Sequence, residues 1–192
     1  SNAGLKAVKS YLYEGGIKVP AIMRWSGIKT KQKEIARPTA LVDIVPTLCE
    51  IVGIEPPENL DGTSLLPLLE GADFHRKRPL YWFFYRTSPE IAMRVGDYMI
   101  LGLDHDTIPL PHQFSQDDYE YLRNIKLQDY ELYDLSKDFS QENDLFDTHP
   151  KKDSLKALLD NQLTEIKNNL YPWKDLPLNL ENRKMKKNWV RY

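Results

Sequence analysis

The stretch LYWFFYRTSPEIAMRVGDYMIL, residues 80–101, decides the fold of the second half of this 192-residue chain. It holds three short runs rich in aromatic and β-branched residues, which favour strands because they pack well on a pleated surface. Gly96-Asp97 separates the second run from the third and is typical of a tight hairpin turn. A fourth run of the same kind covers 130–135. Together the runs predict a small antiparallel sheet of about four strands within residues 78–170.

An amphipathic helix is predicted after the sheet, from about Lys151 to Asn168. Its apolar residues recur at helical spacing: Leu155, Leu158, Leu159, Leu163 and Ile166. We expect this side of the helix to pack on the sheet. The last segment, residues 171–192, contains two prolines and a Lys/Arg-rich end, which indicate an extended basic tail.

The first part of the chain, residues 4–77, predicts a strand and helices of a larger α/β layer. The apolar run from Pro20 to Trp25 is short enough to be a buried strand, although its periodicity alone does not exclude a helix. Apolar residues then recur at helical spacing from Leu41 to Val52, where Gly53 ends the pattern. Thr39 or Asp43 is the expected cap of this helix.

Composition excludes several classes of protein. The net charge is −2 with both signs interspersed, so no nucleic-acid or membrane-binding surface is indicated. No stretch has the apolar length of a membrane span. The single cysteine, Cys49, excludes a disulfide framework and falls on the apolar side of the predicted helix, where we expect it to pack. Residues 1–3, Ser-Asn-Ala, look like a cloning scar.

The run from Lys9 through Glu14-Gly15-Gly16 to Trp25 resembles the segment that borders the sulfate pocket of sulfatases. Further motifs follow in the order of that family. Residues 41–48 resemble V-D-L-x-P-T, and residues 60–69 resemble D-G-x-S-L-x-P-L-L. Residues 93–98 resemble the start of A-V-R-x-G-D-W-K-L, and residues 131–145 resemble E-L-Y-D-L-x-x-D-P-x-E-x-x-N-L, with Phe139 in place of the proline.

The resemblance implies an α+β fold of the alkaline phosphatase-like type, of which this chain is the C-terminal region. It also implies hydrolysis of sulfate esters by a formylglycine nucleophile and a calcium ion, both held by an N-terminal part that lies outside this chain. The residues around Cys49 do not match the formylglycine motif. We therefore expect the chain alone to be inactive, with no metal ligands of its own.

Lys9 is the candidate catalytic and substrate-binding residue. It stands five residues before Glu14, where the family has a lysine that reaches an oxygen of the sulfate ester. A compact positive charge suits this task because the ester oxygens gain charge as the S–O bond breaks. Lys6 is a weaker candidate for the same role, and Glu14 is expected to hold the turn.

Two histidines are further candidates for contact with the substrate. His105 and His112 lie in an unusually long connection, from Gly102 to Gln128, and long loops in compact domains often bind ligands. Solvated loop histidines are the simpler interpretation of both residues.

Two other functions remain open from the sequence. Phosphodiesterases and phosphonate hydrolases of the alkaline phosphatase superfamily share the general plan, and a noncatalytic module that binds sulfated glycans is a second alternative. Family analogy predicts a periplasmic or secreted protein that acts on a sulfated small molecule or glycan. Apolar surface left exposed on the isolated chain is expected to favour self-association.

Overall fold

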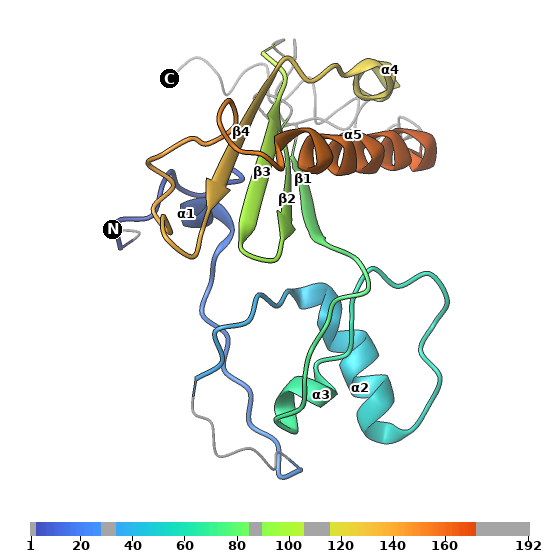
Figure 1. Cartoon of the computed structure of the whole chain (residues 1–192). Helices are drawn as coiled ribbons and strands as arrows, with labels where there is room; N and C mark the ends of the chain where they lie inside the picture. The colour runs from blue at the N-terminus through green and yellow to red at the C-terminus, as the bar shows by residue number, and fades with distance from the viewer. Residues whose placement is uncertain (1–2, 28–33, 85–89, 106–115, 172–192) are drawn as a thin grey trace, which may run out of the picture.

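The computed structural model describes residues 3–27, 34–84, 90–105 and 116–171. Within these ranges the centre of the molecule is a four-stranded antiparallel sheet in the order β1-β2-β3-β4 (Figure 1). The strands are β1 (Leu80–Phe84), β2 (Glu90–Val95), β3 (Tyr98–Leu103) and β4 (Asp129–Asp134). The predicted sheet is confirmed, and strands that follow one another in the chain also pair in the sheet.

The turn between β2 and β3 is the predicted Gly96-Asp97 hairpin. Val95 pairs with Tyr98 at its closed end, and Gly96 has φ 61°, a left-handed conformation that glycine adopts at little cost. The register continues with Arg94 opposite Met99. This pairing places Arg94 next to the turn, at one end of the sheet.

One face of the sheet is covered by α5 (Lys152–Asn169), the predicted C-terminal helix. Buried residues of both elements form the larger core: Ile91, Met93, Ile100, Leu132, Leu155, Leu159 and Leu163. Leu158 was expected on the packed side, but it is 44% exposed. The reason is geometric, because Leu155, Leu159 and Leu163 form the centre of the buried stripe and Leu158 lies at its edge.

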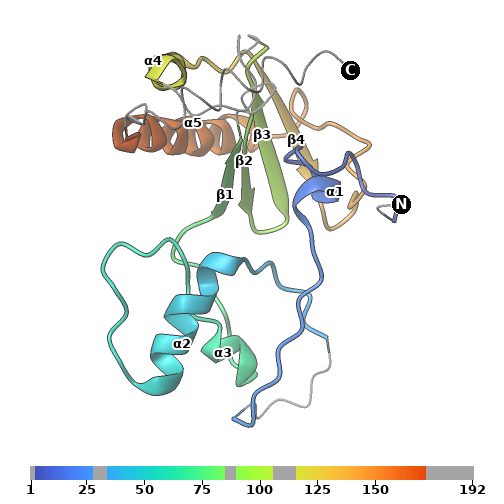
Figure 2. The ribbon, with the colours of Figure 1, turned by 180° about the vertical axis from the view of Figure 1, so that it is seen from behind.

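The other face of the sheet is covered by the N-terminal segment. Leu12 packs there against Ala92, Met99, Leu101 and Tyr133, and the short helix α1 (Glu14–Ile17) follows directly. Figure 2 shows α1 beside β4. Because side chains alternate across a strand, the same strands supply two separate cores.

The predicted strand that ends at Trp25 is not formed. Residues 18–25 have no regular secondary structure, and Val19 and Ile22 are 72% and 98% exposed. A strand is stable only when its backbone groups pair with a neighbour. Figure 1 shows this segment leaving the sheet, and no described strand lies alongside it.

A second group of helices lies below the sheet in Figure 1. It contains the 3-10 turn η1 (Leu41–Asp43), α2 (Ile44–Val52) and α3 (Leu66–Leu69). The predicted helix and its end at Gly53, with φ 73°, are confirmed. Cys49 is buried, as expected for a packing residue.

The side chain of Asp43 links separate segments of this group. Its fully buried carboxylate accepts hydrogen bonds from the backbone N–H groups of Ala40 and Thr63, and it pairs with the Arg76 guanidinium. The hydroxyl of Thr47 adds a bond to the next segment by accepting the N–H of Leu65. Asp43 occupies the N-cap position of α2, as one of the two expectations had it, but its side chain makes no capping hydrogen bond to that helix. At the start of η1 the N-cap is Ala40 and not Thr39, and the Asp43 carboxylate accepts the N–H of Ala40.

The long connection between β3 and β4 contains a helix of its own, α4 (Gln116–Asn124). Leu122 and Ile125 from this connection are buried in the larger core. Residues 106–115, including His112, and the predicted tail from residue 172 lie outside the described residues. None of the helices described here combines the length and apolar character needed to cross a membrane.

Candidate functional site

The candidate residue Lys9 lies on a loop, residues 6–13, that closes on itself; we call it the Lys9 loop. The N–H of Gly15 donates to the carbonyl of Lys6 at 3.0 Å, and the N–H of Tyr11 donates to the carbonyl of Val8 at 3.2 Å. The helix α1 then starts at Glu14, so the loop and the helix form one compact unit. The backbone of Lys9 is therefore held on both sides.

Gly16 allows this closure because the loop backbone lies directly against it. A Cβ atom at Gly16 would lie 2.0 Å from the carbonyl oxygen of Tyr11 and 2.7 Å from that of Val8. Real contacts of this kind essentially never fall below 3.0 Å. The second glycine of the Glu-Gly-Gly motif is thus needed for close approach of the loop.

Lys9 itself is exposed, and no hydrogen bond or ion pair joins it to another described residue. Ala7 and Ser10 flank it with φ 62° and φ 84°, left-handed conformations that are unusual for residues other than glycine. Such strain costs about 1–3 kcal/mol per residue and clusters at functional sites. The loop holds an unpaired cation on a strained backbone.

Lys6, the weaker candidate, is engaged with the sheet. Its ammonium donates to the Tyr133 hydroxyl at 2.6 Å and lies 3.5 Å from a carboxylate oxygen of Glu131. It also lies over the rings of Tyr13 and Tyr133, at 4.3 and 4.8 Å from their centres. The structure therefore separates the two lysines, because one is neutralised and the other is not.

Glu131 is the centre of that contact. One of its oxygens accepts the hydroxyl of Tyr13 at 2.8 Å and the hydroxyl of Tyr133 at 2.7 Å. Burial raises the pKa of Tyr133 well above its usual range, and the hydrogen bond to Glu131 raises it further. Tyr133 consequently keeps its proton and bridges Glu131 to Lys6.

Glu14 is buried, with 4% of its surface exposed, and it faces two cations. Arg94 of β2 and Lys18 each lie 3.5 Å from its carboxylate. The backbone N–H of Glu14 donates to the side-chain oxygen of Gln141 at 2.7 Å. These contacts agree with the expected role of Glu14 in holding the turn.

Sequence reasoning missed the partners of Glu14 and Lys6. Arg94 and Glu131 lie inside motifs that the sequence made visible, but their contacts join residues about 80 and 125 positions apart, and strand periodicity carries no signal for such pairs. The only local clue was chemical. An acidic residue such as Glu14 inside an apolar turn needs a cation nearby.

His105 lies just after β3 and pairs with Asp129 of β4, with its Nε2 atom 2.6 Å from the carboxylate. Both side chains are more than half exposed. Asp129 and Glu131 point to the same face of β4, about 7 Å apart along the strand. His105 therefore lies on the same sheet face as Glu131, the partner of Lys6, although no contact joins it to the Lys9 loop among the described residues.

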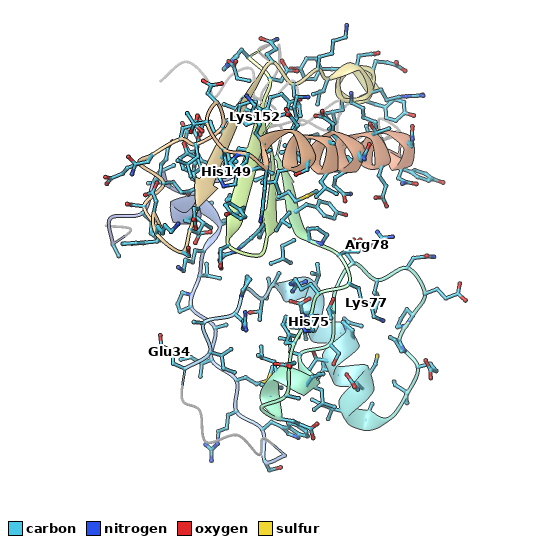
Figure 3. All side chains as sticks on the ribbon, in the orientation of Figure 1. Glu34, His75, Lys77, Arg78, His149 and Lys152 are labelled. Carbon is cyan, nitrogen blue, oxygen red and sulfur yellow. The ribbon has the colours of Figure 1, made fainter. Side chains whose placement is uncertain are left out.

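Two pockets, of about 490 and 320 Å³, lie next to Tyr98. Both are lined by Tyr98, Asp134 and Lys137. His149 and Lys151 lie against the Tyr98 ring, at 4.9 and 5.1 Å from its centre. Figure 3 shows His149 beside the sheet, close to the start of α5. Lys9 lines neither pocket.

A basic run, residues 75–78, leads from the lower helices to β1 (Figure 3). Arg78 lies 3.3 Å from Glu165 of α5 and 3.7 Å from Asp61, so it links the helices to the sheet. Asp61 belongs to no candidate metal site: the described part of the chain contains no group of three or more His, Cys, Asp or Glu that could hold a metal ion.

Comparison with the sequences of known proteins gives three results. The family model described as N-sulphoglucosamine sulphohydrolase, C-terminal, matches residues 7–169. A sulfatase of Formosa agariphila is 28% identical over 180 residues, which are 90% of this chain and 30% of that protein. Human arylsulfatase D is 46% identical over 63 residues, which are 32% of this chain and 11% of that protein.

Among solved structures, that of Ps i-CgsB is similar with a TM-score of 0.61 and 22% sequence identity. The similarity covers 95% of this chain and 36% of that one, and at this identity it shows the fold alone. The chain thus spans less than a third of the length of the two curated relatives above. Because the family model covers most of the chain, including Lys9, the sheet and α5, this protein belongs to the sulfatase family, with the sequence and fold of the family's C-terminal region.

Proposed function

We propose that this chain is the C-terminal part of a sulfatase that hydrolyses sulfate esters of small molecules or carbohydrates, and that Lys9 binds the ester group during the reaction. The names of the curated relatives support a sulfate ester as the reacting group. The observation that carries the role of Lys9 is the contrast between the two lysines of its loop. Lys6 is neutralised by Glu131, whereas Lys9 is exposed on a closed, strained backbone.

The chemistry of Lys9 follows from its charge. The oxygens of a sulfate ester gain negative charge as the S–O bond breaks, so a cation already in place lowers the energy of the transition state. Positioning matters because an ammonium that must first be ordered contributes less. The closed backbone of the Lys9 loop supplies that order.

A second part of the same polypeptide is needed to complete the site. Most of the exposed large apolar side chains among the described residues lie in residues 8–54, including Val19, Ile22 and Leu41. Surfaces of this kind mark interfaces. We infer that an N-terminal α/β part covers them and adds a strand beside residues 18–25.

The formylglycine nucleophile and the calcium ion belong, in this proposal, to that N-terminal part. The residues described here do not fit either group. They contain no cluster of metal-binding side chains, and the single cysteine is buried in α2. The contribution of this chain is therefore the Lys9 ammonium and the scaffold behind it. By family analogy we propose that the whole enzyme is periplasmic or secreted.

The proposal is tested in the longer enzyme with 4-nitrophenyl sulfate as substrate. We expect Lys9→Ala to lower kcat/KM about a hundredfold or more, the effect of removing one group that stabilises charge in a transition state. Lys126→Ala, which changes an exposed lysine far along the chain, is the matched control. A normal rate in the Lys9 variant removes this residue from the site.

The same assays separate the alternative functions. The isolated 192-residue chain is expected to release no sulfate, so turnover by it contradicts the division of the site between two parts. Faster turnover of a phosphodiester or phosphonate ester than of the sulfate favours a phosphoryl-transfer relative. Retention of the isolated chain on sulfated but not neutral polysaccharide favours a noncatalytic binding module.

A further inference from the structure

The Lys9 loop is fixed to the antiparallel sheet at two points, one on each side of Lys9. The first anchor precedes Lys9 and consists of Lys6 held by Glu131 and Tyr133 of β4. The second follows it and consists of Glu14 held by Arg94 of β2. Because the loop also closes through the Gly15–Lys6 hydrogen bond, motion of either anchor must move Lys9.

The first anchor fixes the loop by charge and by ring contacts together. The Lys6 ammonium binds the Tyr133 hydroxyl and also lies over two aromatic rings. Tyr133 is only 2% exposed, so the hydroxyl that receives Lys6 belongs to the core of the sheet. An ammonium bound to a core residue has little freedom, since its partner does not move.

The second anchor is more deeply buried. Arg94 has 19% of its side chain exposed, and the Glu14 side chain has 5%. Gln141 is 1% exposed, has φ 58°, and accepts the N–H of Glu14 through its side-chain oxygen. Its side-chain nitrogen has no partner among the described residues. A buried amide with one unsatisfied group and a left-handed backbone lowers the stability of the fold. This indicates that the bond from Gln141 to Glu14 has a role that offsets the loss.

We propose that Arg94 and Gln141 are positioning residues for Lys9. They lie in the sheet region, have no contact with Lys9 among the described residues, and act through Glu14 by holding the base of the Lys9 loop. This inference rests on the proposed role of Lys9 and extends it. The antiparallel sheet then contributes to the reaction by keeping one ammonium where the ester needs it.

The first test measures the loop itself, in the 192-residue chain and independently of any activity. Hydrogen exchange of the Gly15 and Tyr11 amides is followed in wild type, Arg94→Gln and Gln141→Met. Loss of the Arg94–Glu14 ion pair, or of the hydrogen bond from the Glu14 N–H to Gln141, is expected to speed exchange about tenfold at these amides. Arg94→Lys restores the charge and is expected to return part of the protection. Arg123→Gln, on the exposed side of α4, is the control.

The second test measures coupling in the longer enzyme. Arg94→Gln is expected to lower kcat for 4-nitrophenyl sulfate about tenfold, and Lys9→Ala with Arg94→Gln is expected to be no slower than Lys9→Ala alone. A merely structural role predicts additive losses instead. Additive losses, or loop amides that exchange at the wild-type rate in Arg94→Gln, overturn the proposal.

The two proposals fail in different ways. If Lys9→Ala alone leaves the rate unchanged, the role of Lys9 is wrong and its positioning has no catalytic meaning, even where exchange shows that the anchors hold the loop. If Lys9→Ala is slow while Arg94→Gln retains both its rate and its exchange protection, Lys9 acts in the reaction without these positioning residues.

Discussion

Replacing Gly16 by alanine tests whether close packing holds the Lys9 loop in place. The new Cβ atom would lie 2.0 Å from the carbonyl oxygen of Tyr11, whereas real contacts essentially never fall below 3.0 Å. The loop must therefore move by about 1 Å, and overpacking of this kind costs about 1–3 kcal/mol. A displacement of about 1 Å at a catalytic group can lower a rate about a hundredfold. We expect Gly16→Ala to lower both the stability of the chain and the activity of the longer enzyme.

The effect is measured in two ways. Urea unfolding gives the change in stability, and mass spectrometry of brief trypsin digests gives the rate of cleavage after Lys9, which should rise as the loop opens. Gly53→Ala is the control, because Gly53 ends α2 with φ 73° and nothing lies within 4 Å of its added Cβ. Its left-handed backbone makes alanine unfavourable by about 1–2 kcal/mol without touching the loop. An unchanged urea midpoint with unchanged cleavage after Lys9 in Gly16→Ala would refute the packing argument.

Three further predictions concern stability and association. Asp43→Ala leaves the largely buried Arg76 guanidinium without its carboxylate, so we expect the free energy of unfolding in urea to fall by about 3–5 kcal/mol. A fall below about 1 kcal/mol contradicts the role of Asp43 in linking these segments. The Asp138 carboxylate is partly desolvated, which raises its pKa, but N–H donors from Asn143 and Glu142 outweigh this and hold the pKa below its usual value. The stability that the ionised Asp138 contributes is therefore present at neutral pH and is lost as the pH falls below about 4. Asp138→Asn should make the stability fall less steeply on the acid side. An equally steep fall in the variant contradicts this role of Asp138. Leu48 is 54% exposed on α2, so Leu48→Glu should reduce self-association of the isolated chain in light scattering, while an unchanged mass would place the contact elsewhere.

Elements built from local periodicity could be predicted from the sequence. The strands and the hairpin at Gly96 follow from alternation and turn chemistry, and α5 follows from leucines spaced by four. Leu158 shows the limit of this approach, because it lies at the edge of the apolar stripe and only the packed structure assigns it to solvent. The leucine spacing predicts the helix but not which residues at the edge of its apolar side are buried.

Features that depend on distant partners could not be predicted in the same way. The run from Pro20 to Trp25 has the composition of a buried strand, but a strand needs a neighbour, and none of the described strands lies beside it. Asp43 has the position of a helix cap, yet its carboxylate binds Thr63 and Arg76, which are 20 and 33 residues away. In both cases tertiary contacts, which the local sequence does not encode, decided the outcome.

The charges around the Lys9 loop explain why this lysine, and not its neighbour, is suited to bind an anion. Lys6 and Glu131 neutralise each other, and Tyr133 adds no charge because its raised pKa keeps it protonated. The carboxylate of Glu14, the acidic group nearest to Lys9 in the sequence, is matched by Arg94 and Lys18. The Lys9 ammonium therefore has no competing partner among the described residues, and a sulfate ester brought to this loop meets a cation that need not first break another ion pair.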